Sequence, residues 1–270
     1  MAWPSLPHVV QSERAWSPSL YPRAVRPISV TREGDGPEIL LVHGGASPDA
    51  TWGALAPLRA RWTLACAHRR GYPPSPPPVD GRQDFEVDAA DILPLLASRP
   101  HVVAHSYGVL GALIAAAQRP EDVCSLTLIE PPLYHVVPSD PEIERLERIG
   151  DAVLTEGLDA DPETLRAFLR MAGAPGVDEG PLPEAVANGV RRAHGGRVPG
   201  DARPALDPIR EAAVPSLVAS GNHTPGIERI CDALATALDA ERLVAPGAGH
   251  FVAAAPGFAE RLERFLHASG

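Results

Sequence analysis

One stretch, residues 102–111, constrains the fold of this chain more than any other. It reads Val-Val-Ala-His-Ser-Tyr-Gly-Val-Leu-Gly. An apolar run ends at His105 and small apolar residues follow Ser106, which predicts a buried strand, a sharp turn and a helix. Three backbone segments approach one another in such a turn, so the positions two before and two after the serine must be small. Ala104 and Gly108 meet this condition. The pattern therefore predicts a turn that lifts the hydroxyl of Ser106 clear of a sheet, where a base can reach it.

Strands and helices alternate on both sides of this turn. Short apolar runs predict strands covered on both faces, and apolar residues at helical spacing predict helices between them. This alternation is typical of a mostly parallel α/β sheet with helices on both faces, in which ligands lie at the carboxyl ends of the strands. The expected strands are 27–31, 38–42, 62–67, 102–105, 123–129, 214–220 and 242–245, and the expected helices are 84–97, 107–118, 227–238 and 256–267.

The block from 133 to 205 interrupts the alternation. It contains three expected helices, 141–158, 162–172 and 183–193, each with a proline at or near its start, and no convincing strand. We interpret residues 133–205 as a helical cap inserted over the strand ends of a core formed by residues 28–132 and 206–270. Residues 1–27 are rich in proline and are expected to form an N-terminal arm.

The composition limits the class of partner. The chain has 270 residues, of which 44% are hydrophobic, enough for a sizeable core. Its formal net charge of −10 argues against nucleic acid and against an anionic membrane surface, because both require a basic face. We therefore expect a small-molecule substrate and a protein that acts as a monomer or a homodimer.

Cysteine usage points to a reducing compartment. Cys66, Cys124 and Cys231 are sparse and widely spaced, which indicates free thiols in a cytoplasm and no zinc site. The first residues lack a basic start followed by an apolar run, and we find no apolar span long enough for a membrane. We expect a cytoplasmic protein with no metal and no cofactor.

A serine hydroxyl near neutral pH needs a base within about 3 Å, and the base needs a third group that fixes its tautomer. The expected base is His250, in a glycine-flanked loop after the last strand. Its place in the chain order serine, acid, histidine supports this choice over a surface role.

Catalysis by a serine also needs backbone amides that bind an oxyanion. Tyr107 follows the nucleophile at a helix N-terminus, where free N–H groups favour an anion. The second amide is expected from Gly45 in the loop that begins at His43, with Ala46 as a possible substitute. The alternative interpretation of this loop is a plain tight turn.

The acid is the difficult member of the set. The loop after strand 214–220 usually supplies it, but Thr224 occupies that position and carries no charge. Glu130 ends the strand after the serine strand and faces the same crevice, so we take it as the acid. A carboxylate there is partly desolvated and costly unless paired, and the imidazole N–H of His250 would pair it. Glu228, or a serine–histidine dyad without an acid, is the alternative.

Together these motifs resemble the α/β-hydrolase superfamily, and within it the group with a helical cap after the sixth strand. The resemblance covers roughly residues 28 to 268 and implies an eight-stranded sheet with Ser106 as nucleophile and His250 as base. Thr224 departs from the meta-cleavage C–C hydrolases and the cofactor-free haloperoxidases, which carry aspartate there. Epoxide hydrolases and haloalkane dehalogenases need aspartate where Ser106 stands, so both are excluded. The motifs are His-Gly-Gly at 43–45, Arg-Arg-Gly-Tyr at 69–72, Ala-His-Ser-Tyr-Gly at 104–108, Leu-Ile-Glu-Pro-Pro at 128–132 and Gly-Ala-Gly-His at 247–250.

The expected function is acyl transfer by a serine hydrolase on an ester, thioester or lactone of a small, mostly apolar substrate. Tyr134, Phe168 and Met171 are candidates for the substrate pocket, although such residues at helical spacing are often plain packing. One alternative keeps the fold and uses it for C–C bond cleavage, cyclisation or rearrangement in biosynthesis. A second alternative, prompted by the altered acid position, is an inactive ligand-binding protein.

Overall fold

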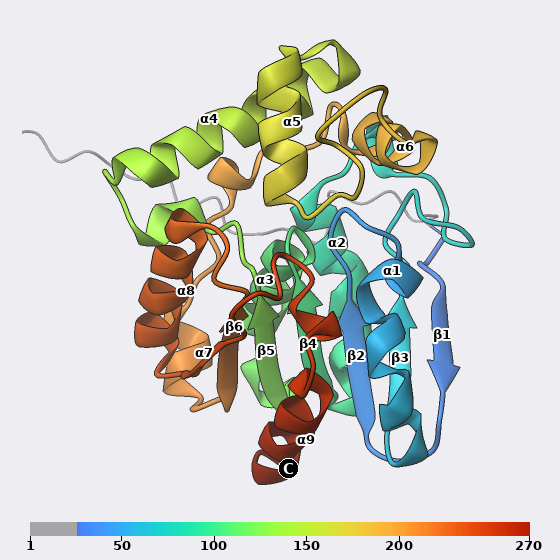
Figure 1. Ribbon diagram of the computed structural model, residues 1–270. Helices are drawn as coiled ribbons and strands as arrows, with labels where there is room; N and C mark the ends of the chain where they lie inside the picture. The colour runs from blue at the N-terminus through green and yellow to red at the C-terminus, as the bar shows by residue number, and fades with distance from the viewer. Residues whose placement is uncertain (1–25) are drawn as a thin grey trace, which may run out of the picture.

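The computed structural model describes residues 26–270, which form one sheet between layers of helices (Figure 1). Seven strands lie in the order β1-β3-β2-β4-β5-β6-β7. β1 pairs antiparallel with β3, and every other pair is parallel. The strands are β1 (Val30–Glu33), β2 (Glu38–Val42), β3 (Thr63–Ala67), β4 (His101–His105), β5 (Ser125–Ile129), β6 (Ser216–Ser220) and β7 (Glu241–Val244).

The α/β class and the mostly parallel sheet are confirmed, but the expected strand count is wrong. The resemblance implied eight strands, and residues 26–270 form seven. Each segment that the sequence marked as a strand overlaps one of these seven strands, and this part of the chain has no further strand. Beyond β7 the chain turns at Gly247 and returns as a helix across one face of the sheet, so it does not extend the edge. Residues 1–25 of the expected arm lie outside the described residues.

Both faces of the sheet are buried because successive residues of a strand point to opposite sides. Leu40 and Val42 of β2 pack in the core under α2 and α3, whereas Ile39 and Leu41 pack with residues of α9. In Figure 1, α1 and α9 lie in front of the sheet and α2 and α3 behind it. The helices are α1 (Pro48–Trp52), α2 (Phe85–Ile92), α3 (Gly108–Gln118), α4 (Pro141–Glu156), α5 (Pro162–Met171), α6 (Glu184–Ala193), α7 (Asp207–Glu211), α8 (Pro225–Leu238) and α9 (Phe258–Ala268).

The helices between β5 and β6 start where side chains cap them. Asp140 accepts hydrogen bonds from the backbone N–H groups of Glu142 and Ile143 at 2.9 and 3.2 Å, and Asp161 accepts one from Thr164 at 2.9 Å. Helices α4, α5 and α6 lie across the top of the molecule in Figure 1, beyond the ends of the parallel strands. They share a small apolar cluster of their own, formed by Val153, Ala160, Leu165, Leu169, Val177 and Val190.

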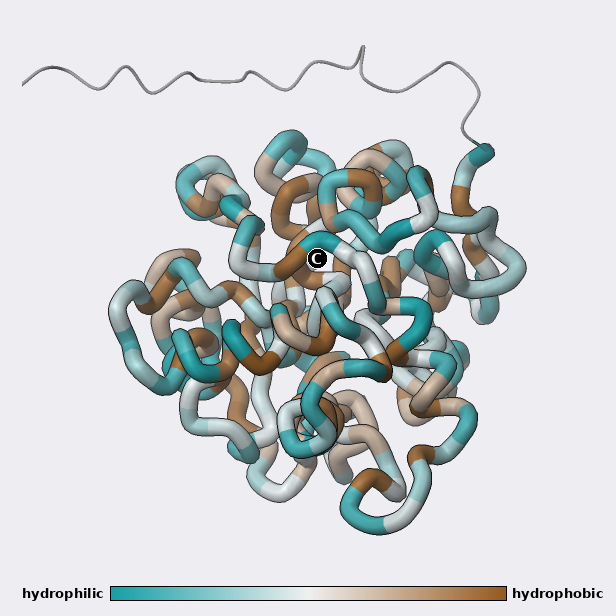
Figure 2. Tube along the Cα trace, turned by 90° about the horizontal axis from the view of Figure 1, so that it is seen from above, coloured by the Kyte–Doolittle hydropathy of each residue, from teal (hydrophilic) through white to brown (hydrophobic). Residues whose placement is uncertain are grey.

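Polar segments occupy many of the outer turns of the chain, as Figure 2 shows from above. Within the described residues, no helix combines the length and the apolar character that crossing a bilayer requires. The sequence did not predict α1, although Ser47 caps it by accepting from the N–H of Ala50 at 3.3 Å. A five-residue helix shows too little periodicity to be recognised by pattern.

Candidate active site

Ser106 sits in a strained turn at the end of β4. Its φ angle is +52°, a conformation that few non-glycine residues adopt, and its N–H donates to the carbonyl of Ile129 at 2.8 Å. A Cβ added to Gly108 would lie 2.3 Å from the carbonyl oxygen of His43. A Cβ on Gly44 would lie 2.7 Å from the Cβ of Ser106. These close approaches explain why small residues surround the serine.

Glu130 occupies a similar turn at the end of the neighbouring strand β5. Its φ angle is +53°, and its N–H donates to the carbonyl of Ala219 at 3.0 Å. The side chain is fully buried, and Oε1 accepts the N–H of Gly221 at 2.7 Å. Strained backbone of this kind persists where the surroundings hold it firmly, and it concentrates at functional sites.

The loop after β7 brings His250 to Glu130. The two side chains approach through His250 Nδ1 and Glu130 Oε2, which lie 3.3 Å apart. The carbonyl of His250 accepts a hydrogen bond from His105 Nε2 at 2.9 Å, and the two rings are 4.6 Å apart between centroids. His250 therefore lies against the residue that precedes Ser106. In residues 26–270, no hydrogen bond joins Ser106 and His250.

Burial shifts the pKa of both Glu130 and His250. It raises the pKa of Glu130 to about 7, against the opposing effects of His223 and of the hydrogen bond from Gly221. Burial also lowers the pKa of His250 to about 3, with a smaller effect of His223 in the same direction. The imidazole of His250 is therefore neutral at physiological pH.

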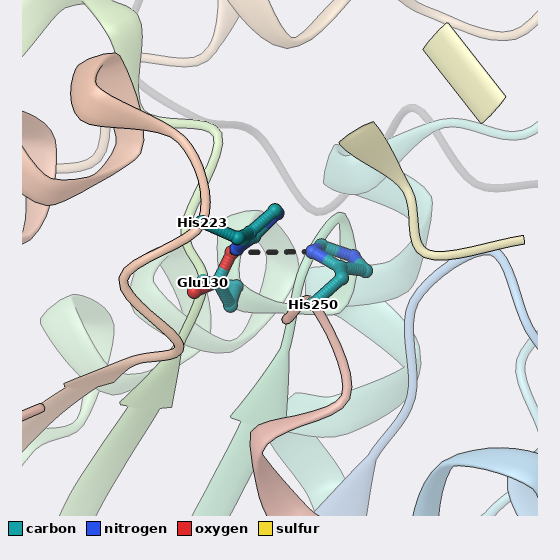
Figure 3. Close-up of side chains that lie close together, drawn as sticks. All are labelled: Glu130, His223 and His250. Carbon is teal, nitrogen blue, oxygen red and sulfur yellow. Dashed lines mark hydrogen bonds and ion pairs between the residues drawn. The ribbon is translucent and has the colours of Figure 1, made fainter. Parts of the chain in front are cut away.

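His223 completes a cluster of three side chains that sequence reasoning missed (Figure 3). It follows β6, and its Nδ1 lies 3.6 Å from Glu130 Oε2. In the sequence, His223 stands three residues after the expected strand 214–220. That location was the available signal, because the carboxyl ends of parallel strands meet at one edge of the sheet.

Of the two other positions considered for the acid, Glu228 is hydrogen-bonded to other groups and position 224 carries a threonine. Glu228 Oε2 accepts from the hydroxyl of Ser220 at 2.6 Å and from Arg242 Nη2 at 2.7 Å. Its other oxygen accepts the N–H of Asn222 at 2.9 Å. Thr224 is buried at the start of α8. Glu130 is thus the carboxylate that contacts His250 in the described part of the chain.

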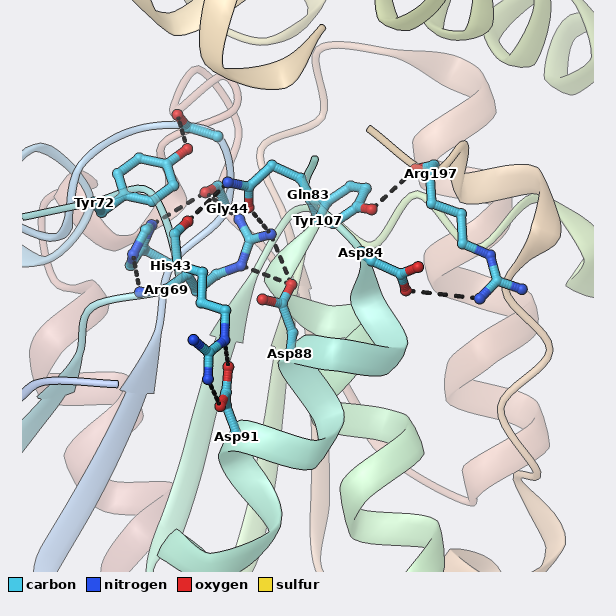
Figure 4. A network of polar contacts seen from close by, with 12 residues as sticks. His43, Gly44, Arg69, Tyr72, Gln83, Asp84, Asp88, Asp91, Tyr107 and Arg197 are labelled. Carbon is cyan, nitrogen blue, oxygen red and sulfur yellow. Dashed lines mark hydrogen bonds and ion pairs between the residues drawn. The ribbon is translucent and has the colours of Figure 1, made fainter. Parts of the chain in front are cut away.

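A buried arginine holds the loop after β2 (Figure 4). Arg69 Nη1 donates to the carbonyl of Gly44 at 2.9 Å, and Nη2 donates to Gln83 Oε1 at 2.8 Å. The same guanidinium forms an ion pair with Asp88 at 2.7 Å, in which both side chains are at most 4% exposed. The charge pair between the loop after β3 and α2 therefore fixes the backbone beside Ser106.

The two backbone N–H groups of the expected oxyanion site have no acceptor within residues 26–270. They belong to Gly45 and Tyr107. The hydroxyl of Tyr72 donates to the carbonyl of Gly45 at 2.7 Å, and the hydroxyl of Tyr107 donates to the carbonyl of Arg197 at 2.9 Å. Both residues are thus held in place while their N–H groups stay free to bind an anion.

Breaking the Arg69 pair is expected to destabilise the fold. We expect Arg69→Met to lower the free energy of unfolding by about 3–5 kcal/mol, because the charge of Asp88 stays buried without a partner. Arg145→Met is the control, since it removes an exposed pair with Glu142 and is expected to cost about 1 kcal/mol or less. Urea unfolding followed by circular dichroism measures both. Equal losses in the two variants would contradict a structural role for the buried pair.

The three candidates for the substrate pocket lie largely in packed surroundings. Tyr134 is 6% exposed and belongs to the core on the face of the sheet covered by α2 and α3. Phe168 packs on the small cluster of the inserted helices, and Met171 packs on the main core. The carbonyl of Met171 accepts a hydrogen bond from His223 Nε2 at 3.0 Å, so the end of α5 lies beside the candidate site. Their contact with substrate stays a prediction.

Comparisons with known proteins agree with this fold. A family model described as alpha/beta hydrolase family matches residues 39–261. Pimeloyl-[acyl-carrier protein] methyl ester esterase from Methylococcus capsulatus is 32% identical over 183 residues, 66% of this chain and 67% of that protein. Fluoroacetate dehalogenase from Burkholderia sp is 31% identical over 124 residues, 43% of this chain and 39% of that protein. The crystal structure of an alpha/beta hydrolase from Sphaerobacter thermophilus matches with a TM-score of 0.59 and 27% identity, covering 88% of this chain and 95% of that chain.

Proposed function

Because this chain belongs to the alpha/beta hydrolase family, we propose that it is a serine hydrolase that transfers the acyl group of an ester, thioester or lactone to water. Its relatives are named as esterases, a dehalogenase and lysophospholipases, which supports hydrolase chemistry. The observation that carries the proposal is the contact between Glu130 and His250 at the sheet edge that also bears Ser106. We propose a small and mostly apolar substrate.

In the proposed reaction, Ser106 Oγ attacks the substrate carbonyl and gives its proton to His250 Nε2. Glu130 accepts the Nδ1–H of His250 and stabilises the imidazolium that forms. The N–H groups of Gly45 and Tyr107 bind the oxyanion. His250 then protonates the leaving group, and a water molecule that His250 deprotonates releases the acid. The hydrogen bond between serine and histidine tightens when substrate binds, as is common at catalytic sites.

The nucleophile distinguishes this proposal from dehalogenation. A dehalogenase of this family is expected to use a carboxylate that attacks carbon and forms an ester with it. Ser106 occupies the corresponding turn here, and its hydroxyl needs a neutral base to lose its proton. Burial lowers the pKa of His250 to about 3, so its imidazole is neutral, and Glu130 lies beside it to stabilise the imidazolium that proton transfer would form.

The pH dependence of activity follows from Glu130. The carboxylate must be ionised to stabilise the imidazolium, and burial raises its pKa to about 7. His250 is already neutral above about pH 3. We expect kcat/KM for an activated ester to rise with pH through about 7 and to fall toward acid. Initial rates across the pH range measure this profile, and a rate that is constant from about pH 5 to 8 would contradict it.

A fluorophosphonate probe tests the proposed function. Such probes react with an activated serine, so Ser106 is expected to be labelled in native protein, and Ser106→Ala is expected to lose the label. Ser98→Ala is the control, because Ser98 is exposed and has an ordinary hydrogen bond to Glu38 at 2.8 Å. Mass spectrometry of the labelled peptide identifies the site. Absence of labelling at micromolar probe in folded protein would overturn the proposal.

A further inference from the structure

The cluster of Glu130, His223 and His250 also has the chemistry of a metal site. One ligand atom from each of the three residues lies within 4.8 Å of the other two. They come from the loops that follow β5, β6 and β7, so residues far apart along the chain converge (Figure 3). This is why the spacing of residues in the sequence gave no sign of a metal site and the cysteines pointed away from one.

The tautomer of His223 makes this arrangement unusual. Its Nε2 lies 3.0 Å from the carbonyl oxygen of Met171, which only accepts, so Nε2 carries the proton. The other ring nitrogen, Nδ1, is the atom that approaches Glu130. That atom is buried and has no hydrogen-bond partner in residues 26–270. It faces Glu130 Oε2 at 3.6 Å, so both atoms are directed at the same spot.

We propose that Glu130, His223 and His250 bind one Zn²⁺ ion and that this ion inhibits the enzyme. Zinc bonds of about 2.0–2.2 Å in a tetrahedral site place neighbouring ligand atoms about 3.4 Å apart. Glu130 Oε2 lies 3.3 and 3.6 Å from the two histidine nitrogens. Two imidazoles and one carboxylate suit zinc better than Mg²⁺ or Ca²⁺, and three protein ligands leave the fourth position to water.

The surroundings of His223 resemble those of a metal ligand. A ligating histidine usually donates its other N–H to a carbonyl or carboxylate, which fixes the ring. The carbonyl of Met171 does this for His223. Glu130 is held in the same way, because its second oxygen accepts the N–H of Gly221 at 2.7 Å. Two of the three proposed ligands are therefore oriented before an ion arrives.

Inhibition follows from the chemistry of His250, and this part of the inference rests on the proposed function. A metal on Nδ1 of a neutral imidazole leaves the ring proton on Nε2. That nitrogen is the one that accepts the proton of Ser106 in the proposed reaction. Binding of Zn²⁺ therefore displaces the Nδ1 proton, shifts the tautomer through solvent exchange and removes the base. It also takes Glu130 away from its role beside the imidazole.

The test measures metal binding directly, without relying on activity. Protein treated with EDTA and dialysed is titrated with Co²⁺, whose visible absorption reports tetrahedral coordination, and with Zn²⁺ in a calorimeter. Wild-type protein and Ser106→Ala are each expected to bind one equivalent. His223→Gln and Glu130→Gln are expected to weaken binding by at least about 100-fold, since each removes a ligand. Circular dichroism shows that each variant is folded.

His194→Gln is the matched control. His194 Nε2 also lies 3.0 Å from a backbone carbonyl, that of Thr155, but this histidine is outside the cluster of ligand atoms. It is expected to leave the dissociation constant unchanged. Wild-type protein that binds no ion at about 100 μM, or that binds equally in His223→Gln, would overturn the proposal.

Measurements of ester hydrolysis provide an independent test. Zinc is expected to inhibit ester hydrolysis by the wild-type protein, EDTA is expected to restore it, and His223→Gln is expected to resist inhibition. A tetrahedral Co²⁺ spectrum in a protein whose metal-free form no fluorophosphonate labels would support the metal site and overturn the serine hydrolase. Labelling without metal binding would do the reverse. Zinc that binds at the cluster and leaves the rate unchanged would overturn the inhibitory role.

Discussion

Ser106→Ala and His250→Ala are each expected to lower kcat for a p-nitrophenyl ester by about 10⁶-fold, and the double variant is expected to lower it no further. The reason is that the two side chains act as one unit. Without the hydroxyl there is no nucleophile, and without the imidazole nothing removes the hydroxyl proton. The residual rate would come from the free N–H groups of Gly45 and Tyr107 and from substrate binding.

Steady-state kinetics with active-site titration measures this effect. The control variant is His135→Ala, which removes a half-buried histidine outside the cluster of Glu130, His223 and His250. It is expected to change kcat by less than about tenfold. Losses that multiply in the double variant would contradict a single unit, because independent contributions to the barrier add as free energies.

Much of the fold could be predicted, because a strand that is buried on both faces has a simple apolar pattern in the sequence. Strands β2, β4, β5 and β6 are short segments rich in apolar residues, and such segments are typical of strands covered by helices on both sides. The family assignment is confirmed over residues 39–261. The count of eight strands came from the resemblance, whereas the expected strand segments number the same as the strands in residues 26–270.

Side-chain contacts between residues that are far apart in the sequence could not be predicted. Arg69 stands in a charged run that suggests a solvated loop, yet its guanidinium is buried against Asp88 on another element. His223 gave no sign of contacting Glu130, since their proximity arises only when β5 and β6 pair side by side. Local pattern reports the side of an element that is buried, but it does not report which polar side chains meet there.

Position at a strand end was the most informative local signal for the candidate site. Ser106 and Glu130 each follow a buried parallel strand, and each adopts a positive φ angle. The two strands are neighbours in the sheet, so the sequence order of their ends translates into proximity. The same reasoning also allowed Glu228 as the alternative to Glu130 for the catalytic acid. Its engagement by Arg242 depends on β7, whose side chains the sequence did not place.

Glu130→Gln is expected to lower kcat by about 10⁴-fold with little change in KM. Glutamine keeps the shape of the side chain and its contact with the N–H of Gly221, but it lacks the charge that stabilises the imidazolium of His250. Its amide is also free to present an N–H to Nδ1, which would hold the imidazole in the wrong tautomer. The loss therefore falls on the step that develops positive charge.

The matched variant is Glu228→Gln, because Glu228 is a second carboxylate at the same end of the sheet, paired with Arg242 at 2.7 Å. It is expected to change kcat by less than about tenfold, whatever it does to stability. The pH profile distinguishes the charge of Glu130 from its shape. The fall in kcat/KM below about pH 7 is assigned to protonation of Glu130, so we expect it to vanish in Glu130→Gln and to persist in Glu228→Gln. A Glu130→Gln enzyme that keeps wild-type kcat and the same limb would show that Ser106 and His250 work as a dyad. In that case the strained backbone at Glu130 would serve the fold alone, through its hydrogen bonds to the loop after β6.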